Sequence, residues 1–118
     1  MNAPSAASQT VILVTNDGMG KSDPELQHKL IAKYFQLLLD DHKLPAAICF
    51  YADGVRLVCS GSPVIEVLRE LQAQGVHLVV CNTCLNHLGL VDDVQVGMVG
   101  GMGDIIEAQW QAEKVITL

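Results

Sequence analysis

This sequence of 118 residues is poor in positive charge, in aromatic side chains and in long apolar runs. It has 7 Lys and Arg residues against 13 Asp and Glu residues, which gives a formal net charge of -6. Nucleic acids and anionic membrane surfaces bind basic patches, so the shortage of positive charge argues against both as partners. No apolar stretch approaches the roughly 20 residues that a membrane-spanning helix needs.

The N-terminus also lacks the features of a secretion signal. Residues 1–9, MNAPSAASQ, have no basic stretch followed by an apolar one. We expect a flexible tail at 1–9 and one domain over 10–118. A cytoplasmic location is the default prediction, and there the four cysteines would stay reduced. Paired cysteines in that setting point to redox chemistry, sulfur chemistry or metal binding.

Half of the residues are apolar; some of them form five short runs, and the stretches between the runs carry others at helical spacing. The predicted strands are 10–15, 46–52, 76–80, 94–99 and 114–118. Continuous apolar strands predict burial on both faces, which is typical of a parallel sheet covered by helices. We therefore expect an α/β fold, a single-domain three-layer α/β/α sandwich with a mostly parallel five-stranded sheet of the flavodoxin-like type. The segment 55–59 is ambiguous between an edge strand and an apolar loop.

Ligands of such a sheet bind beyond the carboxyl ends of its strands, so the loops at that edge form the candidate site. Two of these loops would shape a pocket through Asn16, Asp17, Gly18, Gly20, Gly100 and Gly101. The first loop ends in GKS like a phosphate-binding loop, but Thr15 stands where that motif needs its first glycine. A flexible turn is the better interpretation, and a small-anion site made of backbone amides is the weaker alternative.

The segment 79–90, VVCNTCLNHLGL, places a CxxC motif directly after a predicted strand. Cys81 would end the strand, and Cys84 would lie in the first turn of the next helix, with Asn82 or Thr83 as its N-cap. A helix N-terminus favours a thiolate over a thiol, and the thiolate is the nucleophile. The cysteine pair is therefore the candidate catalytic site.

Three interpretations of this pair stay open. The first is thiol chemistry, either redox exchange or transfer of sulfane sulfur as a persulfide. The second is zinc, with Cys81, Cys84 and His87 as ligands and a fourth from Cys59, His77 or a neighbouring subunit. The third is inert packing. No second CxxC is present, so we predict no metal and no cofactor, and we regard His87 and Cys59 as helpers of the thiols.

Four separated segments resemble the DsrE/DsrF-like family. They are VTNDGMGKSDPELQHKLIAKYFQLLL, FYADGVRLVCSGSPVIEVLRELQAQGV, CNTCLNHLGL and VGMVGGMGDIIEAQWQAEKVITL. Over about 10–118, the chain is most similar to the C-terminal domain of YedF-type proteins connected with selenium metabolism, with Asn82 where glycine is common. The resemblance implies a DsrE-like domain, a homo-oligomer (dimer, trimer or hexamer), and a sulfurtransferase-like role in a sulfur relay.

The resemblance also ranks the two cysteines. The distance from Cys81 to Gly89 matches that between the persulfide cysteine and a later glycine in sulfur-relay relatives, so Cys81 would attack first and Cys84 second. YedF-type proteins carry an extra SirA/TusA-like domain, which implies a separate SirA/TusA-like sulfur carrier as partner here. We predict a carrier of sulfur or selenium, and the alternative is a non-catalytic oligomeric binding module in which the apolar 55–58 segment contacts another subunit.

Overall fold

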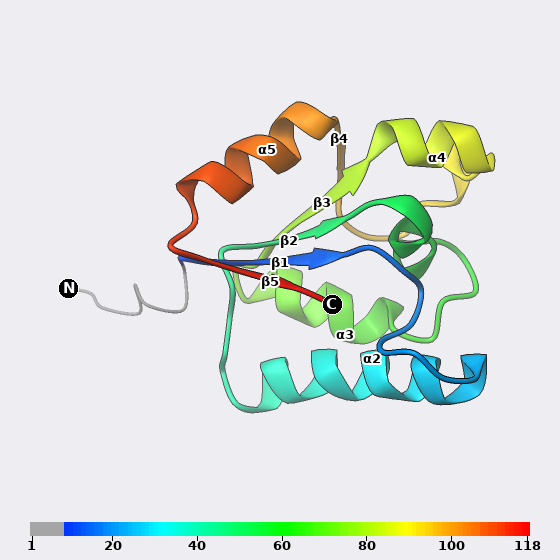
Figure 1. Cartoon of the computed structure of the whole chain (residues 1–118), viewed down its shortest axis with the longest axis horizontal. Coiled ribbons are helices and arrows are strands. Elements are labelled where there is room, and N and C mark those ends of the chain that lie inside the picture. Colours follow the sequence, from blue (N-terminus) through cyan, green and yellow to red (C-terminus); the bar gives the residue numbers. More distant parts are fainter. Residues whose placement is uncertain (1–8) are drawn as a thin grey trace.

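The computed structural model describes residues 9–118, so the predicted tail lies outside the described residues except for Gln9. The chain forms a three-layer α/β/α sandwich around one parallel sheet (Figure 1). The strands are β1 (Thr10–Val14), β2 (Ala47–Phe50), β3 (His77–Cys81), β4 (Met98–Gly100) and β5 (Lys114–Thr117). This architecture confirms the predicted fold class.

The strands lie in the order β4-β3-β2-β1-β5, and all neighbouring strands are parallel. A flavodoxin-like sheet has the order 2-1-3-4-5, so the layered parallel architecture is as predicted while the strand order differs. In the observed order, β3 lies between β2 and β4. The loops that follow these three strands therefore meet at one stretch of the carboxyl edge.

Within the described residues, four α-helices cover the sheet, two on each face (Figure 1). On one face lie α2 (Pro24–Asp40) and α3 (Ile65–Ala73), and on the other α4 (Asn82–Leu88) and α5 (Met102–Gln111). The bounds of α2 follow from local signals, because Asp23 accepts a hydrogen bond from the Leu26 amide and proline opens the helix. Within residues 9–118, no helix combines the length and the apolar character needed to cross a membrane.

The core on the α2 face is built on aromatic and branched side chains. Phe35 of α2 and Phe50 of β2 are fully buried, with ring centroids 6.4 Å apart, and Ile31 lies one helical turn before Phe35. Burial of each such side chain contributes roughly 1.5–3 kcal/mol to stability. The apolar runs that predict strands in the sequence thus supply the buried side chains of this core.

Two short 3-10 helices, η1 (Ala52–Val58) and η2 (Val91–Asp93), change the predicted connections. The ambiguous 55–59 segment is neither strand nor open loop. Val55, Leu57 and Val58 are buried in the chain's own core, so the expectation that this segment exposes its apolar side chains is wrong.

The predicted strand 94–99 is shortened to β4. Val94 instead pairs with Cys59 in an antiparallel bridge, and the Gln95 amide donates to the Val58 carbonyl at 2.8 Å. Gly97 then adopts a φ of 89°, a left-handed conformation that favours glycine and separates this segment from β4.

Candidate functional site

The CxxC cysteines lie at the carboxyl end of β3, where the sequence places them. Cys81 is the last residue of β3 and also the N-cap residue of α4, and Cys84 lies in the first turn of α4. Cys81 is in register with Gly100 of β4. On its other side β3 pairs with β2, whose last residue is in register with Val80. The ends of three strands therefore surround the cysteine pair.

The predicted capping of α4 is wrong. Asn82 and Thr83 are the first two residues of the helix, and no described side chain caps it. The Asn82 side-chain oxygen instead accepts a hydrogen bond from Asn86 Nδ2 at 3.0 Å. The cause is that β3 runs directly into α4, which leaves Cys81 itself at the capping position.

Burial distinguishes the two thiols. Cys81 is 0% exposed, whereas Cys84 is half-buried. Solvent therefore reaches Cys84, whereas Cys81 is covered by the surrounding chain. The predicted order, with Cys81 attacking first, stays a prediction, and it would require Cys81, at the end of an interior strand, to be uncovered.

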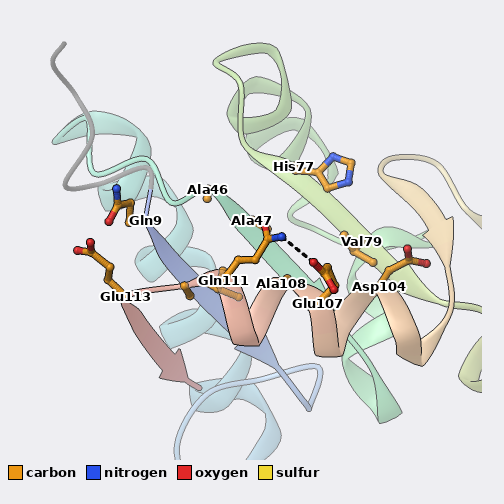
Figure 2. A pocket seen from close by; sticks show the side chains of 12 residues that line it. Gln9, Ala46, Ala47, His77, Val79, Asp104, Glu107, Ala108, Gln111 and Glu113 are labelled. Carbon is orange, nitrogen blue, oxygen red and sulfur yellow. Dashed lines mark hydrogen bonds between the residues drawn. The ribbon is translucent and has the colours of Figure 1, made fainter. Parts of the chain in front are cut away.

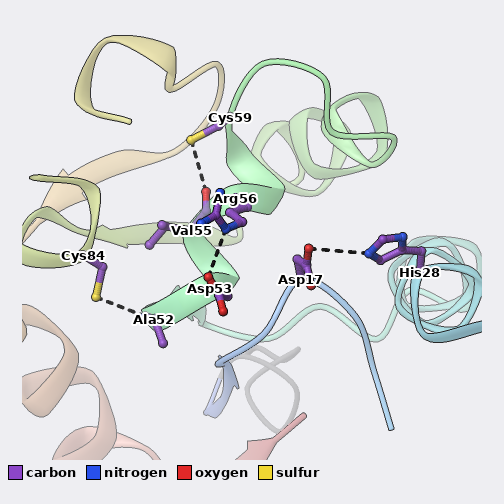
Figure 3. A network of polar contacts seen from close by, with 8 residues as sticks. All are labelled: Asp17, His28, Ala52, Asp53, Val55, Arg56, Cys59 and Cys84. Carbon is purple, nitrogen blue, oxygen red and sulfur yellow. Dashed lines mark hydrogen bonds and ion pairs between the residues drawn. The ribbon is translucent and has the colours of Figure 1, made fainter. Parts of the chain in front are cut away.

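The Cys84 sulfur receives a backbone donor from the neighbouring loop. Cys84 Sγ accepts a hydrogen bond from the Ala52 amide at 3.1 Å (Figure 3). Ala52 begins η1 with a φ of 52°, in the left-handed region that non-glycine residues seldom occupy and that is enriched at functional sites. A hydrogen bond to the Cys84 sulfur favours its charged form, the thiolate.

The pKa of Cys84 is raised above the ordinary thiol range. Burial is the largest cause, the Ala52 amide opposes it by lowering the pKa, and the adjacent Cys81 thiol raises it further. Burial thus outweighs the thiolate-favouring effect predicted for the start of a helix. Cys84 is mainly a protonated thiol at neutral pH, so its nucleophilicity must increase with pH.

A glycine fixes the position of η1 against β1. Gly54 is buried, and a Cβ atom there would lie 2.1 Å from the Val14 carbonyl oxygen. The same carbonyl accepts a hydrogen bond from the Tyr51 amide at 3.1 Å. Because only glycine permits this approach, Gly54 sets where η1 begins and therefore where the Ala52 amide points.

Cys59 and the histidines are not gathered around the cysteine pair. Cys59 is buried at the other end of η1, where its thiol donates to the Val55 carbonyl at 3.3 Å (Figure 3). His87 is exposed in the last turn of α4. His77, at the start of β3, lines a cavity of about 620 Å³ beneath α5, at the opposite end of the strand (Figure 2).

The predicted zinc ligands do not come together. Among residues 9–118, no three His, Cys, Asp or Glu side chains form a group that could hold a metal ion. Cys81 is buried, and its sulfur neighbours Cys84 rather than a histidine. The side chains of residues 9–118 therefore do not assemble the zinc site of the second interpretation.

The loop after β1 closes onto α2 instead of opening toward the thiols. The Met19 amide donates to the Gln27 carbonyl at 3.0 Å, and Gln27 Nε2 donates to the Gly20 carbonyl at 2.9 Å. Gly18 packs so closely that an added Cβ would lie 2.6 Å from Gln27 Cβ. Asn16 in this loop follows β1, which is two strands away from β3.

The glycines at the end of β4 lie nearer the thiols. Gly100 is the residue in register with Cys81, and the Gly101 amide donates to Asp104 Oδ2 at 2.8 Å. A Cβ atom on Gly100 would lie 2.7 Å from the same carboxylate oxygen. Of the six predicted pocket residues, Gly100 and Gly101 adjoin the cysteine pair. The other four lie in the loop after β1, at a different part of the carboxyl edge of the sheet.

Sequence reasoning missed Ala52 because its contribution is a backbone amide, which any residue type carries. The available signal was the turn-forming Ala-Asp-Gly sequence at 52–54, directly after an apolar run. That signal predicts a turn, but it predicts neither the positive φ of Ala52 nor the hydrogen bond from the Ala52 amide to Cys84.

Comparisons with known proteins agree with this architecture. The DsrE/DsrF-like family model matches residues 9–118. The fold is similar to MTH1491, a protein of unknown function from Methanobacterium thermoautotrophicum, with a TM-score of 0.67 and 23% identity over 92% of this chain and 97% of that one. It is also similar to BT1422, a conserved protein of unknown function from Bacteroides thetaiotaomicron, with a TM-score of 0.67 and 18% identity over 99% and 100%.

A third similar structure is the ychN protein from E. coli, with a TM-score of 0.61 and 20% identity over 93% of this chain and 99% of that one. At these identities the likeness to the three structures shows the fold alone. No curated protein matches the chain. The nearer resemblance to YedF-type proteins stays a prediction.

Proposed function

The chain belongs to the DsrE/DsrF-like family, which is linked to sulfur relay, and from this premise we propose that it carries and transfers sulfur as a persulfide on its CxxC thiols. The observation that carries the proposal is the half-buried Cys84 sulfur, bonded to the Ala52 amide and adjacent to the buried Cys81. The Cys84 thiol is open to a sulfur donor. The Cys81 thiol lies next to it and can accept the transferred sulfur or displace it from Cys84.

In the proposed first step, the Cys84 thiolate attacks the terminal sulfur of a donor persulfide, R–S–SH. A new sulfur–sulfur bond forms, the donor's own bond breaks, and the donor leaves as the thiol R–SH with the proton given up by Cys84. The Ala52 amide stabilises negative charge on the Cys84 sulfur. Attack by Cys81 on the terminal sulfur then moves it inward, whereas attack on Cys84 Sγ releases hydrogen sulfide and leaves a disulfide.

The proposed setting is the cytoplasm, with a separate SirA/TusA-like carrier as the exchange partner. All four cysteines are free thiols, as persulfide exchange requires. Selenium, the other predicted cargo, would be attacked by the same thiolate, and nothing in the site geometry favours it over sulfur.

The proposal is tested by loading the reduced protein from a small persulfide donor and measuring intact mass. We expect the parent chain to gain sulfur and the double variant Cys81→Ser/Cys84→Ser to gain none. The matched control is Cys49→Ala/Cys59→Ala, which removes the other two cysteines, both buried, and should load normally. Equal loading of the parent chain and the Cys81/Cys84 variant, both folded by circular dichroism, would refute the proposal.

We also propose that the predicted homo-oligomer forms through the outer face of α5 and the edge strand β4. This surface gathers large apolar side chains that are 44–84% exposed: Met98, Val99, Met102, Ile106 and Trp110. Edge strands are normally protected by charge or proline, and Met98–Gly100 contains neither. A face made of uncharged side chains also lets two acidic chains meet without placing like charges together.

Replacing Ile106 with glutamate should therefore dissociate the oligomer, because two buried carboxylates would face each other across the contact. The matched control is Leu37→Glu on α2, since Leu37 is 47% exposed against 48% for Ile106 but lies outside this face. Light scattering after size-exclusion chromatography should give a lower mass for the Ile106 variant alone. Identical masses for both variants and the parent chain would contradict this interface.

A further inference from the structure

A second cavity opens at the carboxyl edge of the sheet, away from the cysteine pair. It has a volume of about 250 Å³ and lies between the loop after β1, α2, η1 and the loop before α3. Arg56 and Leu57 of η1 line it, whereas Cys84 contacts Ala52 at the start of the same 3-10 helix. Figure 3 shows Asp17 and His28 on the side of η1 away from Cys84. No residue of the proposed sulfur site lines this cavity.

One wall of the cavity offers donors for an anionic group. Arg56 Nε donates to Asp53 Oδ1 at 3.0 Å, which orients the guanidinium, and its terminal nitrogens bond to no group within residues 9–118. Two such nitrogens match the two oxygens of a carboxylate. The Ser62 oxygen accepts from the Val64 amide at 3.2 Å, so its hydroxyl hydrogen is available for the same ligand.

Other walls offer an acceptor and an apolar surface. The Asp17 carboxylate lies 3.5 Å from His28 Nε2 through one oxygen, and its second oxygen can accept from an ammonium group. Pro63 is exposed and supplies apolar surface to the cavity, whereas Ile31 and Leu57, which also line it, are only 0% and 3% exposed. The cavity thus combines a guanidinium whose terminal nitrogens are unbonded among the described residues, a carboxylate and a small apolar surface.

From this combination we infer that the cavity binds a small zwitterion of the α-amino acid class. The carboxylate of the ligand would lie on Arg56 and Ser62, its ammonium on Asp17, and a short side chain against Pro63. The volume is below the roughly 300–1,000 Å³ of sites for drug-sized ligands, so the side chain must be small. A pure anion would face the Asp17 carboxylate, and a pure cation would face Arg56, so each alone is disfavoured.

The inference is tested with L-alanine, propionate and ethylamine as probes, because the last two are alanine without its amino or its carboxylate group. Each is titrated into the full chain, and the backbone amide signals of Leu57 and Gly61 are followed by NMR. We expect alanine to bind with a Kd on the order of 1 mM, and the other two roughly tenfold or more weaker. Propionate or ethylamine binding as tightly as alanine would overturn the zwitterion assignment, as would a lack of any shift with alanine.

Variants locate the binding in this cavity. Arg56→Gln and Asp17→Asn should each weaken alanine binding roughly tenfold or more, since each removes one charged partner. The control is Arg69→Gln, because Arg69 forms a similar pair with Glu66 at 3.0 Å and is comparably exposed, but lies outside the cavity. Unchanged affinity in the two cavity variants, with otherwise native spectra, would refute the site. Sulfur loading does not enter this experiment, so its outcome is independent of the thiol proposal.

Discussion

Replacing Cys84 with serine should slow sulfur loading roughly a hundredfold or more, whereas a Cys81→Ala chain should still take up one sulfur per molecule. The reason is access: Cys84 is half-buried and bonded to the Ala52 amide, while Cys81 is fully buried. Loading is measured by intact mass after timed quenching of a reaction with a small persulfide donor. The Cys81 variant should also retain its persulfide longer, because it lacks the thiol that would release hydrogen sulfide from Cys84.

The pH dependence provides a second readout of the same experiment. Burial holds the pKa of Cys84 above the ordinary thiol range, so the thiolate fraction, and with it the loading rate, should rise about tenfold per pH unit from neutrality up to that pKa. Cys81 also raises the pKa of Cys84, so Cys81→Ala should shift the curve toward lower pH. Cys49→Ala, which removes another fully buried sulfur, should leave the curve in place.

The opposite pattern would change the mechanism. If the Cys84 variant loads normally and the Cys81 variant does not, Cys81 is the first nucleophile, as the family resemblance implies, and the end of β3 must open during the reaction. A loading rate independent of pH between neutrality and the ordinary thiol range would contradict the raised pKa of Cys84.

Gly54→Ala should lower the free energy of unfolding by about 3 kcal/mol or more. The added Cβ would lie 2.1 Å from the Val14 carbonyl oxygen and 2.8 Å from its carbon, and both are backbone atoms in a central strand. The chain can relieve this clash only by moving η1 away from β1, which also breaks the hydrogen bond from Tyr51 to Val14. Urea denaturation followed by circular dichroism measures the loss.

Gly103→Ala is the matched control for this substitution. Gly103 lies within α5, and an added Cβ would meet no atom within 4 Å. Alanine is the better helix former, so this variant should be up to about 1 kcal/mol more stable than the parent chain. Equal stability of the two variants would show that η1 does not depend on the close approach at Gly54.

Local sequence signals predicted most of the elements. The start of α2 depends on local signals alone, because its cap residue and its first-turn proline are adjacent in the sequence. The end of β3 was found for a similar reason, since an apolar run ends where the CxxC begins. The strand at 94–99 was overestimated because Val94 pairs with Cys59, a contact between residues 35 positions apart that no local pattern contains.

The sequence by itself determined the layered α/β fold and the place of the thiol pair at the carboxyl edge, because apolar periodicity and helix caps act over a few neighbouring residues. Only the tertiary structure decided the strand order and which of Cys81 and Cys84 is exposed. It also decided that the amide of Ala52, 32 residues before Cys84, donates to its sulfur. These features arise from packing between distant segments, where burial, a close glycine contact and a positive φ depend on all the surrounding elements at once.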